Sequence, residues 1–235
     1  MTSLPPKPEQ APEKVLQAAK SNSLGGFERT LVRRTRKRIF GEIAVTHIYD
    51  FEEGIIYEGT EGVLRAYHWD KIVRVYLAST RHYVNGRYSW TGYGATVVLA
   101  DGGKLALSGM FLDPAYRDDK KQRTADEFEI YLLMADAARS ASESQLPGTL
   151  ARLRQGEEVA FGDIKLSLAG VHTVKGFVPW DTIKDVQVRN GVAQIKQAGK
   201  FFPLSKQPVG QIPNLPLFSL LASALRSGQQ EMRPG

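Results

Sequence analysis

An internal duplication is the feature of this 235-residue sequence that most restricts its possible folds. Four short signals and a final apolar helical pattern recur in the same order. In the first copy the signals are Gly54-Ile55, Trp69-Asp70, Asn85-Gly86 and Gly103-Lys104. In the second copy they are Gly170-Val171, Trp180-Asp181, Asn190-Gly191 and Gly199-Lys200. The separation of equivalent signals falls from 116 to 96 residues, which predicts two homologous domains, the second with shorter strands and loops.

Strand-length apolar runs separated by turn signals dominate each copy. Ile72–Leu77 and Ala95–Leu99 are rich in β-branched residues, and Asn85-Gly86 suits the positive φ angles of a hairpin turn. The helical patterns come late: one follows Thr124-Ala-Asp-Glu127, which has the spacing of a capping box, and the other follows Asn214 as its N-cap. The expected fold class is α+β, mainly β, with about seven antiparallel strands and a C-terminal helix in each copy.

Changes in composition divide the chain into five expected segments. Prolines near the N-terminus indicate a flexible arm with one short helix at most, and a stretch that contains Ser, Gln, Pro and Gly indicates a linker between the copies. The expected segments are an N-terminal arm at 1–26, a first domain with a basic entry segment at 27–141, a linker at 142–150, a second domain at 151–228 and a disordered tail at 229–235.

Two segments of the second copy resemble a known superfold. Phe177–Val186 contains Trp-Asp-x-Ile between two strand patterns and is similar to bacterial PH-like (pleckstrin-homology) and GRAM-like domains. Ile212–Phe218 resembles an uncharacterised, mainly actinobacterial family built from such domains. The resemblance covers residues 41–228 and implies two tandem PH-like split barrels. A β-sandwich or a lipocalin-like barrel is the alternative, although a terminal helix in each copy argues against a plain sandwich.

The best-known activity of the PH family does not transfer to this chain by residue. PH domains that bind phosphoinositides resemble one another in a set of Lys and Arg residues over the first two strands and their loop. The corresponding segments here are acidic at Asp50–Gly54 and nearly neutral at Phe161–Lys165. The first would repel a phosphorylated headgroup, and the second would not clamp one.

Motifs of known enzymes are missing from the sequence. The chain has no cysteine, which excludes disulfides, thiolate nucleophiles and Cys-type zinc sites, and it has no Walker loop, nucleophile elbow or His-Glu-x-x-His motif. The four histidines are scattered singly along the sequence. We therefore expect a non-enzymatic protein with no catalytic residue, no cofactor and no metal. An enzyme with a ligand cavity inside a β-barrel is the less favoured alternative.

The hairpin around Asn85-Gly86 contains the candidate partner-binding residues. A two-residue turn would pair Tyr83 with Tyr88 and Arg81 with Trp90, so these four side chains would share one face. On the same face Val75 and Leu77 resemble core residues. Cross-strand aromatic packing, with Arg81 stacked on Trp90, explains the cluster without a ligand. The alternative is a partner-binding rim, because exposed aromatic and Arg side chains often dominate the affinity of interfaces.

The net charge of +6 is concentrated near the N-terminus. Residues 1–40 contain nine Lys or Arg and three Glu, whereas the remaining residues are balanced. The candidates for contact with an anionic surface are Arg29, Arg33, Arg34, Arg36, Lys37 and Arg38. An anionic membrane or nucleic acid would attract these cations, and a solvated linker is the plain alternative.

The sequence favours a non-enzymatic adaptor with a protein partner. The alternative is a peripheral sensor of an anionic membrane, or less favourably of nucleic acid, that docks through the basic segment. No secretory signal or unbroken apolar span is recognisable, so we expect a cytoplasmic protein with peripheral membrane contact as a further option.

Overall fold

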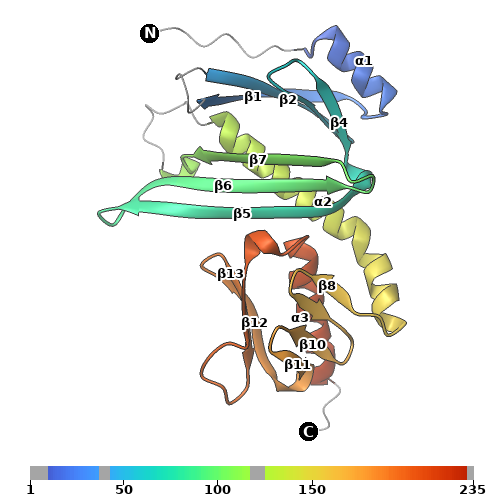
Figure 1. The fold of residues 1–235 in the computed structure, drawn as a ribbon, viewed down its shortest axis with the longest axis vertical. Helices are drawn as coiled ribbons and strands as arrows, with labels where there is room; N and C mark the ends of the chain where they lie inside the picture. Colours follow the sequence, from blue (N-terminus) through green and yellow to red (C-terminus); the bar gives the residue numbers. More distant parts are fainter. Residues whose placement is uncertain (1–9, 37–42, 117–124, 232–235) are drawn as a thin grey trace. The chain divides into compact units, whose positions relative to one another are not determined.

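The computed structural model describes residues 10–36, 43–116 and 125–231. Over these residues the fold is α+β and mainly β, with three α-helices and four antiparallel sheets (Figure 1). The described strands do not form a closed barrel. The chain divides into two compact units, one of residues 1–72 with 111–132 and the other of residues 73–110 with 133–235.

The first unit contains the helix α1 and a four-stranded sheet in the order β1-β2-β3-β4. Its elements are α1 (Glu13–Ser21), β1 (Phe27–Arg36), β2 (Ile43–Phe51), β3 (Gly54–Glu58), β4 (Leu64–His68), the 3₁₀ turns η1 (Trp69–Lys71) and η2 (Pro114–Tyr116), and the start of α2 (Ala125–Arg154). The expectation of a flexible arm over residues 1–26 is wrong for α1. The helix buries Val15 and Ala19 against Phe51 and Ile56 of the sheet, because its apolar residues recur at helical spacing on one face.

A buried carboxylate fastens α1 to this sheet. Glu58 of β3 accepts a hydrogen bond from the Tyr49 hydroxyl at 2.7 Å and pairs with Lys14 of α1. His47 Nδ1 lies 3.5 Å from the same carboxylate. Burial alone would raise the pKa of Glu58, but the bonds from Lys14 and Tyr49 outweigh it, and the pKa is lowered. Burial and the bond to Glu58 raise the pKa of Tyr49. The network therefore holds Glu58 charged and Tyr49 neutral.

Acid should weaken this attachment. A lowered pKa in the folded state means that Glu58 stabilises the fold above its ordinary pKa of 4.5, and that this contribution is lost as the pH falls through the folded pKa. Glu58→Gln should reduce the free energy of unfolding by about 1–2 kcal/mol at pH 7. Urea denaturation at pH 7 and pH 3 measures the free energy of unfolding of the wild type and of the Glu58→Gln variant. If the difference between the two proteins were as large at pH 3 as at pH 7, this account would be contradicted.

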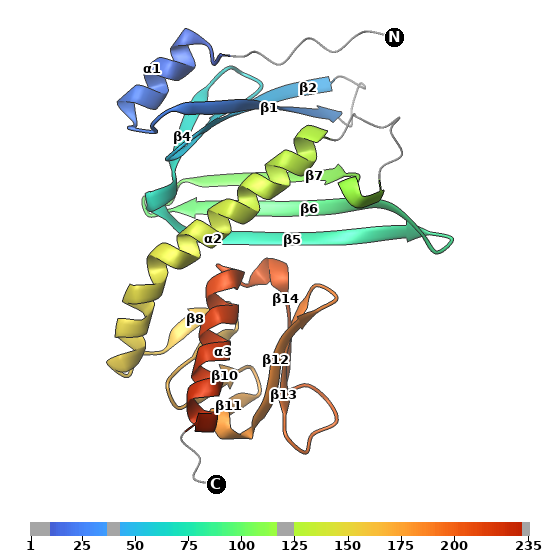
Figure 2. The ribbon, with the colours of Figure 1, turned by 180° about the vertical axis from the view of Figure 1, so that it is seen from behind.

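The second unit contains the long hairpin of the first copy and the whole of the second copy. Its strands are β5 (Ile72–Val84), β6 (Arg87–Leu99), β7 (Lys104–Phe111), β8 (Val159–Phe161), β9 (Ile164–Leu166), β10 (Gly170–Thr173), β11 (Gly176–Pro179), β12 (Ile183–Arg189), β13 (Val192–Gln197) and β14 (Ser205–Pro208). The 3₁₀ turns η4 (Trp180–Thr182) and η5 (Val209–Gln211) and the helix α3 (Leu215–Glu231) complete it. Figure 2 shows α3 beside the strands of the second copy, where Leu217, Phe218 and Leu221 join the core.

The expected linker at 142–150 is helical, because α2 continues without a break to Arg154. Its polar residues are satisfied inside the helix: the hydroxyls of Ser142 and Thr149 donate to the carbonyls four residues earlier, at 2.6 and 2.8 Å. Leu146, Leu150 and Leu153 pack against the core of the second copy. The composition suggested a linker, but the leucine spacing gives this part of α2 a buried face. The expected disordered tail at 229–235 is likewise wrong for residues 229–231, which continue α3.

The two copies recognised in the sequence contain the same elements in the same order. Each copy has a four-stranded sheet, a 3₁₀ turn that begins at the Trp, a three-stranded sheet and a helix. The Trp69 amide donates to the carbonyl of Glu53 at 2.9 Å, and the Trp180 amide donates to the carbonyl of Ala169 at 3.3 Å. In both copies the acceptor directly precedes the repeated glycine, so the two corners share one backbone connection.

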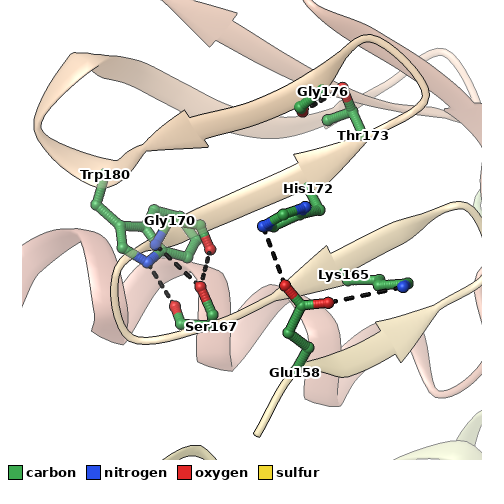
Figure 3. Close-up of polar contacts among 8 residues, drawn as sticks. All are labelled: Glu158, Lys165, Ser167, Gly170, His172, Thr173, Gly176 and Trp180. Carbon is green, nitrogen blue, oxygen red and sulfur yellow. Dashed lines mark hydrogen bonds and ion pairs between the residues drawn. The ribbon is translucent and has the colours of Figure 1, made fainter. Parts of the chain in front are cut away.

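The repeated glycines, Gly54 and Gly170, have no room for a side chain. A Cβ on Gly54 would lie 2.3 Å from the Tyr67 carbonyl oxygen, and one on Gly170 would lie 2.3 Å from that of Val178. In the second copy the corner also buries Trp180, whose indole donates to the Ser167 carbonyl at 2.8 Å (Figure 3). Gly170 and Trp180 therefore belong to a tightly packed corner of the second copy.

Asn214 connects the start of α3 to the outer edge of β5. Its backbone amide donates to the Val75 carbonyl at 2.8 Å, and its Oδ1 accepts from the Val75 amide at 2.8 Å. Its Nδ2 donates to the carbonyl of Val73 and to Oε1 of Gln145. The carbonyl of Asn214 accepts the first helical bond, from Phe218, as an N-cap would, but the side chain binds β5 instead of the helix.

Candidate partner-binding site

The tip of the β5–β6 hairpin is the part of the first copy with the least support from neighbouring strands. β5 and β6 each have 13 residues, whereas β7 has eight and follows β6 after a short turn at the end remote from the tip (Figure 1). Asn85 and Gly86 have φ angles of 50° and 75°, which confirms the predicted two-residue turn. The tip is thus a two-stranded ribbon.

Tyr83 and Tyr88 lie together, as predicted. Their ring centroids are 6.1 Å apart with an interplanar angle of 76°, an edge-to-face contact. The Tyr88 hydroxyl is also 2.9 Å from Oγ1 of Thr91. Tyr83 is 56% exposed, so the pair offers one aromatic ring to a partner while the other holds it in place.

Trp90 does not share a face with Arg81 and Tyr83, so this part of the prediction is wrong. Its ring stacks on His82, with centroids 3.6 Å apart, and lies over Gly92, where a Cβ would be 2.8 Å from the indole. His82 alternates with Arg81 and Tyr83 along β5 and therefore points to the opposite face. Because Tyr88 contacts Tyr83 and Trp90 contacts His82, we infer that the alternation of β6 breaks between Tyr88 and Trp90, as in a β-bulge.

Sequence reasoning missed Val84, which is 60% exposed beside Tyr83. Arg81 and Arg87 are also exposed on the ribbon. Tyr83 and Val84 are successive residues of β5 and therefore project from opposite faces of the ribbon, with Arg81 and Arg87 nearby. A protein that encloses the tip can bury both side chains and add charge-assisted hydrogen bonds to the arginines. The position of Val84 next to the Asn-Gly turn was the available signal, since no third strand reaches that point.

Four of the six cations proposed for an anionic surface, Arg29, Arg33, Arg34 and Arg36, lie in β1, and two of these four are paired with carboxylates. Arg29 bonds Asp50 at 2.9 Å and Glu129 at 2.8 Å, and Arg33 is buried with its Nε 3.4 Å from Glu127. Arg34 is exposed. The side chain of Arg36 and the residues Lys37 and Arg38 lie outside the described part of the structure. Two of the six candidates are therefore neutralised by carboxylates within their own unit.

Three histidines lie near a carboxylate. His68 Nδ1 is 2.6 Å from Asp70, His47 lies beside Glu58, and His172 Nε2 is 3.0 Å from Glu158, which also pairs with Lys165 (Figure 3). Sequence spacing did not reveal the His47–Glu58 and His172–Glu158 pairs, because the first joins β2 to β3 and the second joins β10 to the residue before β8. Among the described residues no group of three or more His, Asp and Glu side chains is placed to hold a metal ion.

Comparison with protein families finds one similarity, in the C-terminal part of the chain. Residues 120–231 match DUF6585, described as a family of unknown function. The region similar to DUF6585 includes α2, all strands of the second copy and α3. No curated protein matches the chain. No helix of the described residues is both long and apolar enough to span a membrane.

Proposed function

We propose that this chain is a non-enzymatic adaptor, built from two PH-like repeats, that recognises another protein through the tip of the β5–β6 hairpin. The observation that carries the proposal is the pair of large apolar side chains at the tip, Tyr83 and Val84, which are 56% and 60% exposed. A four-stranded sheet, a three-stranded sheet and a helix that follow one another in the same order in both copies support the PH-like architecture. A cytoplasmic location is part of the proposal.

A protein partner fits the tip better than a small ligand does. A two-stranded ribbon projects side chains on both faces and encloses no cavity, whereas small ligands bind in concave sites. Exposed Tyr beside Arg is a common composition for the centre of a protein interface. The Tyr83–Tyr88 contact orders the ring before binding, which reduces the entropy lost when a partner docks.

The alternative function, a sensor that docks on anionic membrane or nucleic acid through the β1 cations, has less support. Arg29 and Arg33 already bond three carboxylates of the first unit. Moving these side chains to phosphates would leave Asp50, which is buried, without its guanidinium partner. The cost of that exchange makes β1 a weak docking surface.

Loss of the two apolar side chains should abolish partner capture without unfolding the protein. Tyr83→Ala with Val84→Ala should lower the free energy of unfolding by only about 1 kcal/mol, since both residues are largely exposed. In a crosslinked pull-down from the native host, we expect the wild type to return one reproducible protein and the double variant to lose it. A photo-crosslinker at position 83 should label the same protein.

Val188→Ala is the matched control. Val188 is 47% exposed and precedes Asn190-Gly191 by the same spacing as Tyr83 precedes Asn85-Gly86. The Val188→Ala variant should capture the partner protein as the wild type does. Retention of the partner by the Tyr83→Ala, Val84→Ala variant would refute the proposed site, and a loss of several kcal/mol would show that the tip packs internally.

A further inference from the structure

The loop between β13 and β14 presents two phenylalanines to solvent. Phe201 is 96% exposed and Phe202 is 77% exposed. Their rings are in edge-to-face contact, with centroids 5.4 Å apart. Single exposed apolar residues are common on protein surfaces, but contiguous exposed apolar surface often marks an interaction site. Two adjacent phenylalanines with this exposure form such a surface. This surface was not recognised from the sequence.

Both ends of the loop are fixed, so the phenylalanines project from a defined base. The Lys200 amide donates to the Gln197 carbonyl at 3.2 Å, and the Leu204 amide donates to the Ile195 carbonyl at 2.8 Å. Leu204 packs against the core of the second copy. Only the segment between these anchors, with Phe201 and Phe202, leaves the body of the repeat.

A third exposed apolar residue, Val174, and three lysines accompany the two phenylalanines. Val174, in the turn between β10 and β11, is 77% exposed and lines a shallow hollow of about 380 Å³ together with Phe202. Lys175 and Lys206 line the same hollow and are exposed, as is Lys200 at the base of the loop. Asp163 is the acidic residue of that lining. The three lysines therefore exceed the acid around an apolar protrusion.

We propose that this aromatic loop, defined as Phe201, Phe202 and Val174 with Lys175, Lys200 and Lys206, docks on an anionic lipid bilayer. A bilayer interface accepts apolar rings below the headgroups while lysines remain beside the lipid phosphates. Phe201 and Phe202, together with Val174, are the most exposed large apolar side chains of the described residues, so they are available to insert into a fluid surface. The surface is separate from the hairpin tip, so the inference goes beyond the proposed recognition of a protein.

Vesicle sedimentation of the full chain tests the inference. The probes are vesicles of phosphatidylcholine alone and of phosphatidylcholine with about one-third phosphatidylserine. We expect binding to the anionic vesicles that weakens as salt rises from about 0.05 M to about 0.5 M. Phe201→Ser with Phe202→Ser should lower the partition coefficient at least tenfold. Lys175→Gln, Lys200→Gln and Lys206→Gln together should remove the preference for anionic vesicles.

The control variant carries Val63→Ser and Val188→Ser, which remove two exposed valines away from the loop. It should bind as the wild type does, and the melting temperatures of all variants should agree. Failure of the wild type to sediment with anionic vesicles at low salt would overturn the inference. So would equal binding by the Phe201→Ser, Phe202→Ser variant, or a wild type that binds both vesicle types equally.

Discussion

Gly170→Ala is expected to reduce the free energy of unfolding by about 3 kcal/mol or more. The added Cβ would lie 2.3 Å from the Val178 carbonyl oxygen and 2.7 Å from the Phe177 ring. Phe177 is 45% exposed and can move away, but the carbonyl belongs to the paired strand β11. Strands β10 and β11 would have to separate there, which would disturb the corner that buries Trp180. Chemical denaturation measures the loss.

Two further glycine variants make this expectation specific. Gly54→Ala should be destabilising to a similar degree, because its Cβ would meet the Tyr67 carbonyl oxygen at the same 2.3 Å. Gly94→Ala, in β6, should be neutral or slightly stabilising, since a Cβ there meets nothing within 4 Å. If Gly170→Ala were as stable as Gly94→Ala, the close approach of the strands would not exist in solution.

Asn214→Ala is expected to reduce the free energy of unfolding by about 3 kcal/mol. The substitution removes the acceptor of the buried Val75 amide and the donor to Val73 and Gln145. It also places alanine at a φ of 49°, a left-handed conformation that costs about 1 kcal/mol for a residue with a Cβ. Thermal or urea denaturation of the full chain measures the combined effect.

Asn214→Gly separates the two contributions. Glycine adopts the positive φ without strain, so this variant should lose only the side-chain hydrogen bonds, about 2 kcal/mol. Equal stability of Asn214→Gly and the wild type would mean that the side chain contributes nothing to holding α3 on β5. Asn214→Asp keeps the acceptor for Val75 and should fall between the wild type and glycine.

Sequence reasoning recovered the features that depend on local chemistry. Asn85-Gly86 adopts the predicted turn because asparagine and glycine tolerate positive φ, and the repeated Gly and Trp signals occupy equivalent corners. These requirements act within a few residues or across one pair of strands. The same patterns therefore appear in the sequence at regular positions, and element order could be predicted from them.

Features that depend on distant or exceptional contacts could not be predicted. Trp90 was placed beside Arg81 because strict alternation was assumed along both strands, whereas its ring stacks on His82; the neighbouring Tyr83–Tyr88 contact was predicted correctly. Pro147 suggested a linker, but it lies inside α2 because tertiary packing of the nearby leucines outweighs its missing amide. The bond of Asn214 to Val75 spans 139 residues and has no local signature.

The contact of Asn214 with β5 has a consequence for synthesis of the chain on the ribosome. The edge amide of Val75 is made early, whereas its partner is translated 139 residues later. At ordinary elongation rates of about 5–20 residues per second, that delay is roughly 7–28 s. During this interval the nascent β5 offers an unpaired strand edge, the kind of template that invites association between chains. Slow translation or high expression should therefore favour aggregation of incomplete chains, and chaperones that bind near the ribosome exit would encounter β5 before α3 exists.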